Sequence, residues 1–90
     1  MDNKKYIDKV INHLVRGTKI DYKNNFIYFP FSSPSSRIQS LTFFSLSRRR
    51  KPLFSFSKYC RNQFGLTEEE VEYVWKEYRE IIKNKIENGK

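Results

Sequence analysis

Cationic and aromatic side chains alternate in the middle of this sequence. An unbroken cationic run at residues 48–51 is followed by Phe54, Lys58, Tyr59 and Arg61. Guanidinium groups bind phosphates through paired N–H donors, and aromatic rings stack on unpaired bases. The pattern therefore predicts binding to nucleic acid, mainly through phosphates, and the candidate contact residues are Arg37, Arg48, Arg49, Arg50, Lys51, Lys58, Tyr59 and Arg61.

Not every ring of this segment is available to a ligand. Phe56 and Phe64 share helical spacing with Cys60 and are assigned to the core, which leaves Tyr59 and Phe54 for stacking. The sequence has no recognised RNA- or DNA-binding signature, so sequence-specific readout is not predicted. A basic amphipathic segment can also bind anionic lipid or a helix-binding acidic protein, but its apolar side is narrow here and we expect no membrane partner.

The positive charge is concentrated in the same part of the chain. Residues 22–67 contain no Asp or Glu and carry eight Lys and Arg, a balance of +8 that equals the formal net charge of the whole chain. Residues 1–21 have five Lys and Arg against three Asp, and residues 68–90 have five against seven Glu. Such a field attracts polyanions. The expected partner is nucleic acid, RNA or DNA, with an acidic protein surface as the alternative.

The residues needed for catalysis or cofactor binding are missing. One cysteine, Cys60, and one histidine, His13, are too few for a zinc site, and no local signature links His13 to a nucleophile. The three glycines are far apart, which excludes a Gly-rich phosphate loop. Glutamates 68–70 are explained as the acidic first turn of a helix. We therefore expect a non-catalytic binding protein without metal or cofactor.

The N-terminal third combines a helix with a hairpin. Apolar residues at helical spacing predict an amphipathic helix over about residues 4–16, with Gly17 as its stop. The segments around Lys23-Asn24-Asn25 alternate with period two and predict a β-hairpin with Phe26 and Tyr28 on its more polar face. Those two rings could stack on bases, although such a face is more often covered or solvated. With a two-residue turn, the pairs on the apolar face are Tyr22 with Ile27 and Ile20 with Phe29.

The middle of the chain gives a weaker structural signal. Residues 31–36 are a Ser/Pro connector, and residues 37–61 are a basic segment rich in aromatic residues and serine. Ser36-Arg37-Ile38-Gln39 has the form of a capping box and predicts a helix that continues into the basic run. Ser, Thr and Phe are weak helix formers, however, so a strand or an arm that orders only on a partner stays open as the alternative.

Two helices are predicted in the C-terminal part. A short one follows Pro52 and stops at Gly65. Thr67 and Glu70 form a capping box that begins a long amphipathic helix. Its inward stripe comprises Val71, Val74, Trp75, Tyr78, Ile82 and Ile86.

The predicted fold class is α+β and mainly helical: an N-terminal helix, a β-hairpin, then two to three helices ending in the long capped one. A chain of 90 residues has room for a single small domain, residues 1–90. Aromatic residues make up 17% of it, and rings that each bury about 150–250 Å² can supply most of its thin core.

Composition also suggests where such a protein works. A single cysteine excludes an internal disulfide, and no apolar run approaches the roughly 20 residues of a membrane span. We expect an intracellular protein of the cytoplasm, the nucleoid or a host cytoplasm. The absence of alanine and the abundance of Lys, Asn and Ile are typical of an AT-rich genome, such as that of a phage. A second hypothesis is therefore a structural or adaptor subunit of a larger viral, phage or organellar assembly that binds an acidic protein surface.

Overall fold

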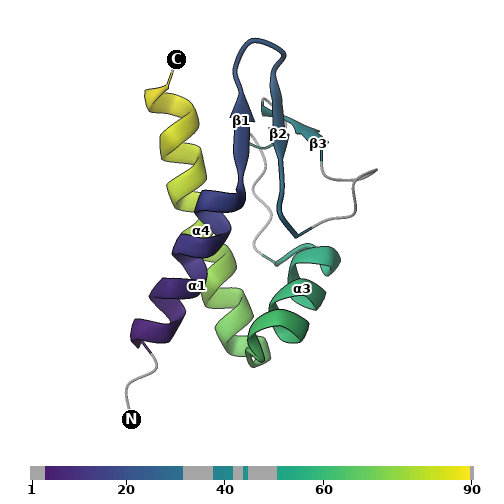
Figure 1. Ribbon diagram of the computed structural model, residues 1–90, viewed down its shortest axis with the longest axis vertical. Coiled ribbons are helices and arrows are strands. Elements are labelled where there is room, and N and C mark those ends of the chain that lie inside the picture. The colour runs from purple at the N-terminus through teal and green to yellow at the C-terminus, as the bar shows by residue number, and fades with distance from the viewer. Residues whose placement is uncertain (1–3, 32–37, 42–43, 45–50, 90) are drawn as a thin grey trace.

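Two helices pack against each other along the long axis of the molecule, with a small sheet and a further helix beside them (Figure 1). The computed structural model describes residues 4–31, 38–41, 44 and 51–89. The α+β, mainly helical fold class is confirmed. The elements are α1 (Lys4–Gly17), β1 (Lys19–Asp21), β2 (Phe26–Tyr28), β3 (Ile38–Ser40), α3 (Phe54–Phe64) and α4 (Glu68–Asn88).

Helix α4 is the longest element, and α1 and α3 both pack against it. It begins with the predicted capping box: the Glu70 backbone N–H donates to Thr67 Oγ1 over 3.2 Å, and the Thr67 N–H donates to Glu70 Oε1 over 2.8 Å. The whole predicted stripe of apolar residues along α4 is buried. The capping box therefore fixes where α4 begins, and the spacing of its apolar residues fixes which face meets the core.

Helices α1 and α3 end where the sequence predicts. Residue Gly17 closes α1, and Gly65 follows α3 with φ +64°, a left-handed conformation that glycine adopts without steric cost. The Tyr6 hydroxyl donates a hydrogen bond of 2.7 Å to the Phe64 carbonyl, which ties the first turn of α1 to the last turn of α3. The buried positions of α3 are Phe56 and Cys60, as their spacing predicts.

The hairpin keeps its predicted apolar face, but the predicted register is wrong. Ile20 pairs with Ile27, whereas a two-residue turn would pair Ile20 with Phe29. A shift of two residues leaves every side chain on its original face, because side chains alternate with period two. Ile27 and Phe29 are accordingly buried, while Tyr22 lies in the loop and is exposed.

The register is set by the loop at residues 22–25. The Asp21 carboxylate accepts the backbone N–H of Asn24 over 3.2 Å and its side-chain amide over 2.8 Å. Asn25 has φ +62°, a conformation that asparagine tolerates better than most residues. These local bonds close a four-residue loop in place of the two-residue turn.

A third strand corrects the predicted helix that begins at Ser36. Residues Ile38–Ser40 form β3, which pairs antiparallel with β2, so the sheet order is β1-β2-β3. Pairing with β2 satisfies backbone groups at an edge that the hairpin alone would expose. Leu41 and Phe44 have helical backbone and are buried, so the helical pattern applies only after the strand. The connector at residues 32–36 and the arginines at residues 48–50 lie outside the described residues.

Aromatic rings join these elements into one core. Phe56 of α3 lies edge-on to Trp75 of α4 at 4.8 Å and to Phe31 at 5.0 Å, measured between ring centroids. Phe31 in turn stacks on Phe29 at 4.8 Å and meets Tyr78 edge-on at 6.0 Å. The few large rings therefore connect the end of β2 to both C-terminal helices, as the composition predicts for a thin core.

Candidate nucleic-acid interface

The structure describes half of the eight candidate contact residues, and all of these lie in α3 or shortly before it. They are Lys51, Lys58, Tyr59 and Arg61. The other candidates fall outside the described residues: Arg37, Arg48, Arg49 and Arg50.

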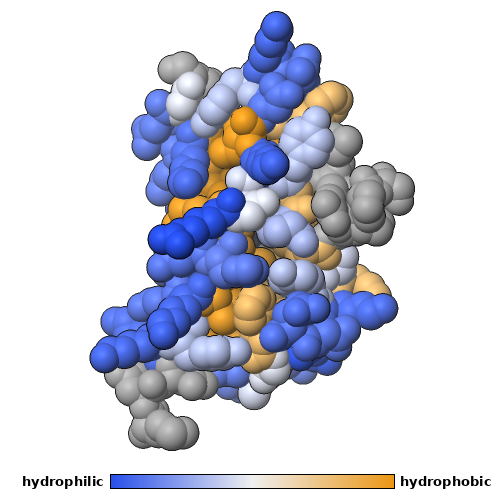
Figure 2. Space-filling model, viewed as in Figure 1, coloured by the Kyte–Doolittle hydropathy of each residue, from blue (hydrophilic) through white to orange (hydrophobic). Residues whose placement is uncertain are grey.

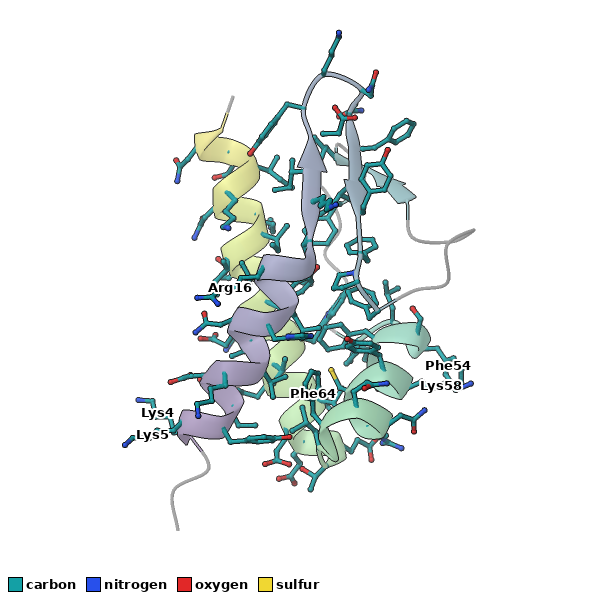
Figure 3. The ribbon with its side chains drawn as sticks, viewed as in Figure 1. Lys4, Lys5, Arg16, Phe54, Lys58 and Phe64 are labelled. Atoms are coloured by element: carbon teal, nitrogen blue, oxygen red, sulfur yellow. The ribbon has the colours of Figure 1, made fainter. Side chains whose placement is uncertain are left out.

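The outer face of α3 pairs a ring with a cation. Phe54 is 81% exposed, far more than any other large apolar side chain in the described residues, and Lys58 follows it one helical turn later. Residues four apart in a helix share a face, so the two side chains are neighbours. Figure 3 shows both of them extending away from the body of the molecule. This surface can offer one aromatic face and one cation to the same ligand.

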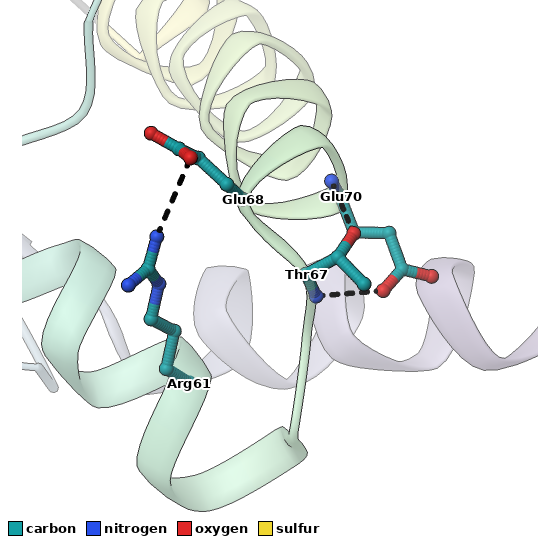
Figure 4. A network of polar contacts seen from close by, with 4 residues as sticks. All are labelled: Arg61, Thr67, Glu68 and Glu70. Carbon is teal, nitrogen blue, oxygen red and sulfur yellow. Dashed lines mark hydrogen bonds and ion pairs between the residues drawn. The ribbon is translucent and has the colours of Figure 1, made fainter.

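The other two candidates on α3 are less accessible. Tyr59 is half-buried, and its ring meets Phe64 edge-on at 5.9 Å while packing against the core. Arg61 Nη2 lies 3.9 Å from Glu68 Oε2 across the α3–α4 turn (Figure 4). An exposed pair at this distance contributes little stability, but the carboxylate opposes an approaching phosphate. Phe54 is therefore a better stacking candidate than Tyr59, and Lys58 a better phosphate ligand than Arg61.

The two C-terminal helices begin in opposite electrostatic ways. Helix α4 has three glutamates in its first turn and a capping side chain, both of which suit the positive end of a helix dipole. Helix α3 has no acidic residue in its first turn and no capping hydrogen bond from its N-cap, Leu53, and the cationic run 48–51 precedes it directly. The start of α3 therefore lacks the acidic residues and the capping side chain that stabilise the start of α4.

A second cationic stripe, which the sequence prediction missed, lies on α1. Lys5, Lys9 and Arg16 are exposed at spacings of four and seven residues, close to whole helical turns, and hydrophilic residues cover α1 in Figure 2. Lys5 and Arg16 extend to the side opposite Phe54 and Lys58 in Figure 3. The charge balance of residues 1–21, in which three Asp offset five Lys and Arg, does not reveal this stripe, whereas the helical spacing of its cations would have indicated it.

The one cysteine of the chain is buried, and its one histidine is exposed. Cys60 is buried, and burial raises the pKa of its thiol to about 12, so the thiolate is not populated at neutral pH. His13 is exposed and meets Phe64 edge-on at 5.5 Å. Among residues 4–31, 38–41, 44 and 51–89, no three His, Cys, Asp or Glu side chains are grouped so that they could hold a metal ion.

No helix within the described part of the chain is both long and apolar enough to cross a membrane. Comparisons with family models, with curated proteins and with solved structures found no match to this chain.

Proposed function

We propose that this protein binds nucleic acid, mainly through phosphate contacts, on the outer face of α3 and the cationic run that precedes it. In this proposal Lys51 and Lys58, with Arg48–Arg50, neutralise phosphates, and Phe54 stacks on a base. The protein acts by binding and carries out no chemistry of its own.

One observation carries the proposal: Phe54, 81% exposed, lies one turn from Lys58 in a stretch of chain without any carboxylate. Leaving a phenyl ring in water forgoes about 1.5–3 kcal/mol of burial, so a ring held out on a cationic surface suggests a ligand that covers it. Single-stranded nucleic acid offers both a phosphate for the cation and a base for the ring. An acidic protein surface would also pair with the cations and bury the ring, so the experiment below is chosen to separate it from nucleic acid.

The start of α3 supports an anionic ligand independently of the ring. The N–H groups of a first helical turn and the dipole of the helix attract phosphate, and the cationic run 48–51 adds to the same field. Cations close to a helix N-terminus disfavour the helix, and a bound phosphate would offset that cost.

The test compares two substitutions on the proposed surface with a matched one elsewhere. Lys58→Ala should weaken binding to a labelled single-stranded oligonucleotide and make the slope of log K against log salt shallower by about 0.7, because one phosphate contact is lost. Phe54→Ala should weaken binding to single strands without changing that slope. Lys76→Ala removes another exposed lysine, from the acidic helix α4, and should have no effect.

Two outcomes would contradict the proposal. Equal effects of Lys58→Ala and Lys76→Ala would mean that the protein binds through its net charge and not through α3. No binding at about 50 mM salt, where phosphate-driven affinity is high, would leave the cationic face to an acidic protein and make an adaptor role the better hypothesis.

A further inference from the structure

The face of the sheet that points away from the core presents two aromatic rings on its central strand. In β2, Ile27 is buried, so Phe26 and Tyr28 on either side of it point to the opposite face. Phe26 is 41% exposed and Tyr28 is half-buried. Across β1, the residue opposite Tyr28 is Lys19, and β3 places Ser40 opposite Phe26.

A hollow of about 560 Å³ lies beside Tyr28. This volume is within the range of roughly 300–1,000 Å³ that small ligands occupy, so it has room for a nucleobase. At its margin a side chain on Gly17 would come within 2.8 Å of Pro30, so the close approach of α1 to the end of β2 depends on glycine. The residues that line the hollow are Gly17, Lys19, Tyr28, Phe29 and Pro30.

The spacing of the rings suits a single strand better than a duplex. Residues two apart in a strand are separated by about 6.6 Å at about 3.3 Å per residue. Bases stacked in a duplex are about 3.4 Å apart, so one base on each ring must be unstacked from its neighbour. Unpaired and separated bases are the form in which single-stranded nucleic acid is bound by aromatic side chains.

We infer that this face binds single-stranded nucleic acid, with successive bases on Phe26 and Tyr28, the hollow receiving the second base, and Lys19 contacting the phosphate between or beside them. The inference rests on the proposed function and extends it to a second surface. Asp21 pairs with Phe26 in the sheet, and its negative charge would favour a path of the phosphate backbone nearer to Lys19. That carboxylate accepts two hydrogen bonds from Asn24 of the loop.

The sheet face and α3 are close enough to act on one strand. Figure 1 shows the first turn of α3 next to the lower end of β2, and the rings of Phe31 and Phe56 join the two at 5.0 Å. A nucleic-acid strand that leaves Tyr28 toward the end of β2 therefore runs toward α3, the helix that carries Phe54 and Lys58.

The test uses the full chain and an oligo(dT) strand as the probe. Phe26→Leu and Tyr28→Leu, which keep apolar side chains of strand-compatible size, should each weaken binding about 5- to 100-fold, with the salt slope unchanged, because stacking on one base is lost. Phe26→Trp should keep the affinity of the wild type, and oligo(dT) should quench the fluorescence of the introduced indole. The native Trp75 is only 3% exposed and provides a constant background.

Tyr73→Leu is the matched control, since Tyr73 is 47% exposed but lies on the acidic helix α4, and it should bind oligo(dT) as the wild type does. Wild-type affinity in both sheet variants, or unquenched fluorescence of the Phe26→Trp variant when saturated with oligo(dT), would overturn the inference. If that result came with lost binding in Lys58→Ala, the proposed function would stand without the sheet face. If the wild type bound no strand at low salt, both proposals would fall.

Discussion

One hydrogen bond links the end of α1 to the middle of α4 and permits a sharp test of the core. Thr18 Oγ1 donates its only hydrogen to the Leu14 carbonyl over 2.8 Å. The 2.6 Å contact between Thr18 Oγ1 and the Tyr78 hydroxyl therefore has Tyr78 as the donor. Burial also raises the pKa of Tyr78, so the hydroxyl remains protonated and keeps this role throughout the physiological pH range.

The direction of this bond makes the two partners unequal. Tyr78→Phe removes the donor but leaves Thr18 bonded to Leu14, and should cost about 1 kcal/mol of the free energy of unfolding. Thr18→Val leaves the buried Tyr78 hydroxyl and the Leu14 carbonyl without their partner, and should cost about 1–3 kcal/mol. In the double variant no hydroxyl is stranded at Tyr78, so its cost should be smaller than the sum of the two single costs by about 1 kcal/mol.

Thermal unfolding of the four proteins would measure these differences. For a domain of this size, 1 kcal/mol corresponds to about 4–8 °C in Tm, so the order of stability should be wild type, Tyr78→Phe, then Thr18→Val. Costs that simply add in the double variant, or a Tyr78→Phe variant less stable than Thr18→Val, would refute the assigned donor.

Three further predictions concern single groups. Thr67→Ala removes the oxygen that caps α4 and should cost about 1 kcal/mol of unfolding free energy; an unchanged Tm would contradict its capping role. Burial raises the pKa of Cys60 to about 12, against 9.0 for an exposed thiol. Cys60 should therefore react with a thiol reagent at pH 8 about 1,000-fold more slowly in the native state than in urea, and a rate difference below tenfold would contradict this burial. The side-chain and backbone hydrogen bonds from Asn24 lower the pKa of Asp21. The stability that Asp21 contributes is therefore present above its pKa in the unfolded chain and is lost as the pH falls through its pKa in the folded protein. Asn24→Ala should raise the Asp21 pKa in an NMR titration, and an unchanged pKa would exclude these hydrogen bonds as the cause.

Local signals predicted the helices well because each helix contains its own start or stop. The capping box of Thr67 and Glu70 and the stop at Gly65 depend only on residues within one or two turns. The buried face of α4 followed from apolar spacing alone, since a helix has one face toward the core.

Strand pairing was less predictable because it depends on distant residues. The two-residue turn satisfied every local rule for Asn24-Asn25, but Asp21 closes the loop two residues further back than that turn requires. The segment at Ile38 had a helix-start pattern and a strand-forming composition, and the free edge of β2 decides between them. Neither choice could be made without knowing where β2 lies.

The sequence predicted the cationic part of the candidate site and named Phe54 and Tyr59 as stacking rings, but it did not show which of the two is exposed. Composition located the acid-free segment, since charge needs no fold to be counted. Which rings face water depends on packing: Tyr59 turned toward Phe64, whereas Phe54 and Phe26 were left exposed. An exposed ring and a core-facing ring are the same residue types in the sequence, and only the structure tells them apart.

The slope of log K against log salt for oligo(dT) binding tests the central claim most directly. If the five cations at residues 48–51 and 58 each neutralise a phosphate, the slope for a single strand should be about −3.5, and affinity should fall about 100-fold between 50 and 200 mM salt. A slope shallower than about −1, or no binding at 50 mM, would contradict a phosphate-binding function for this surface.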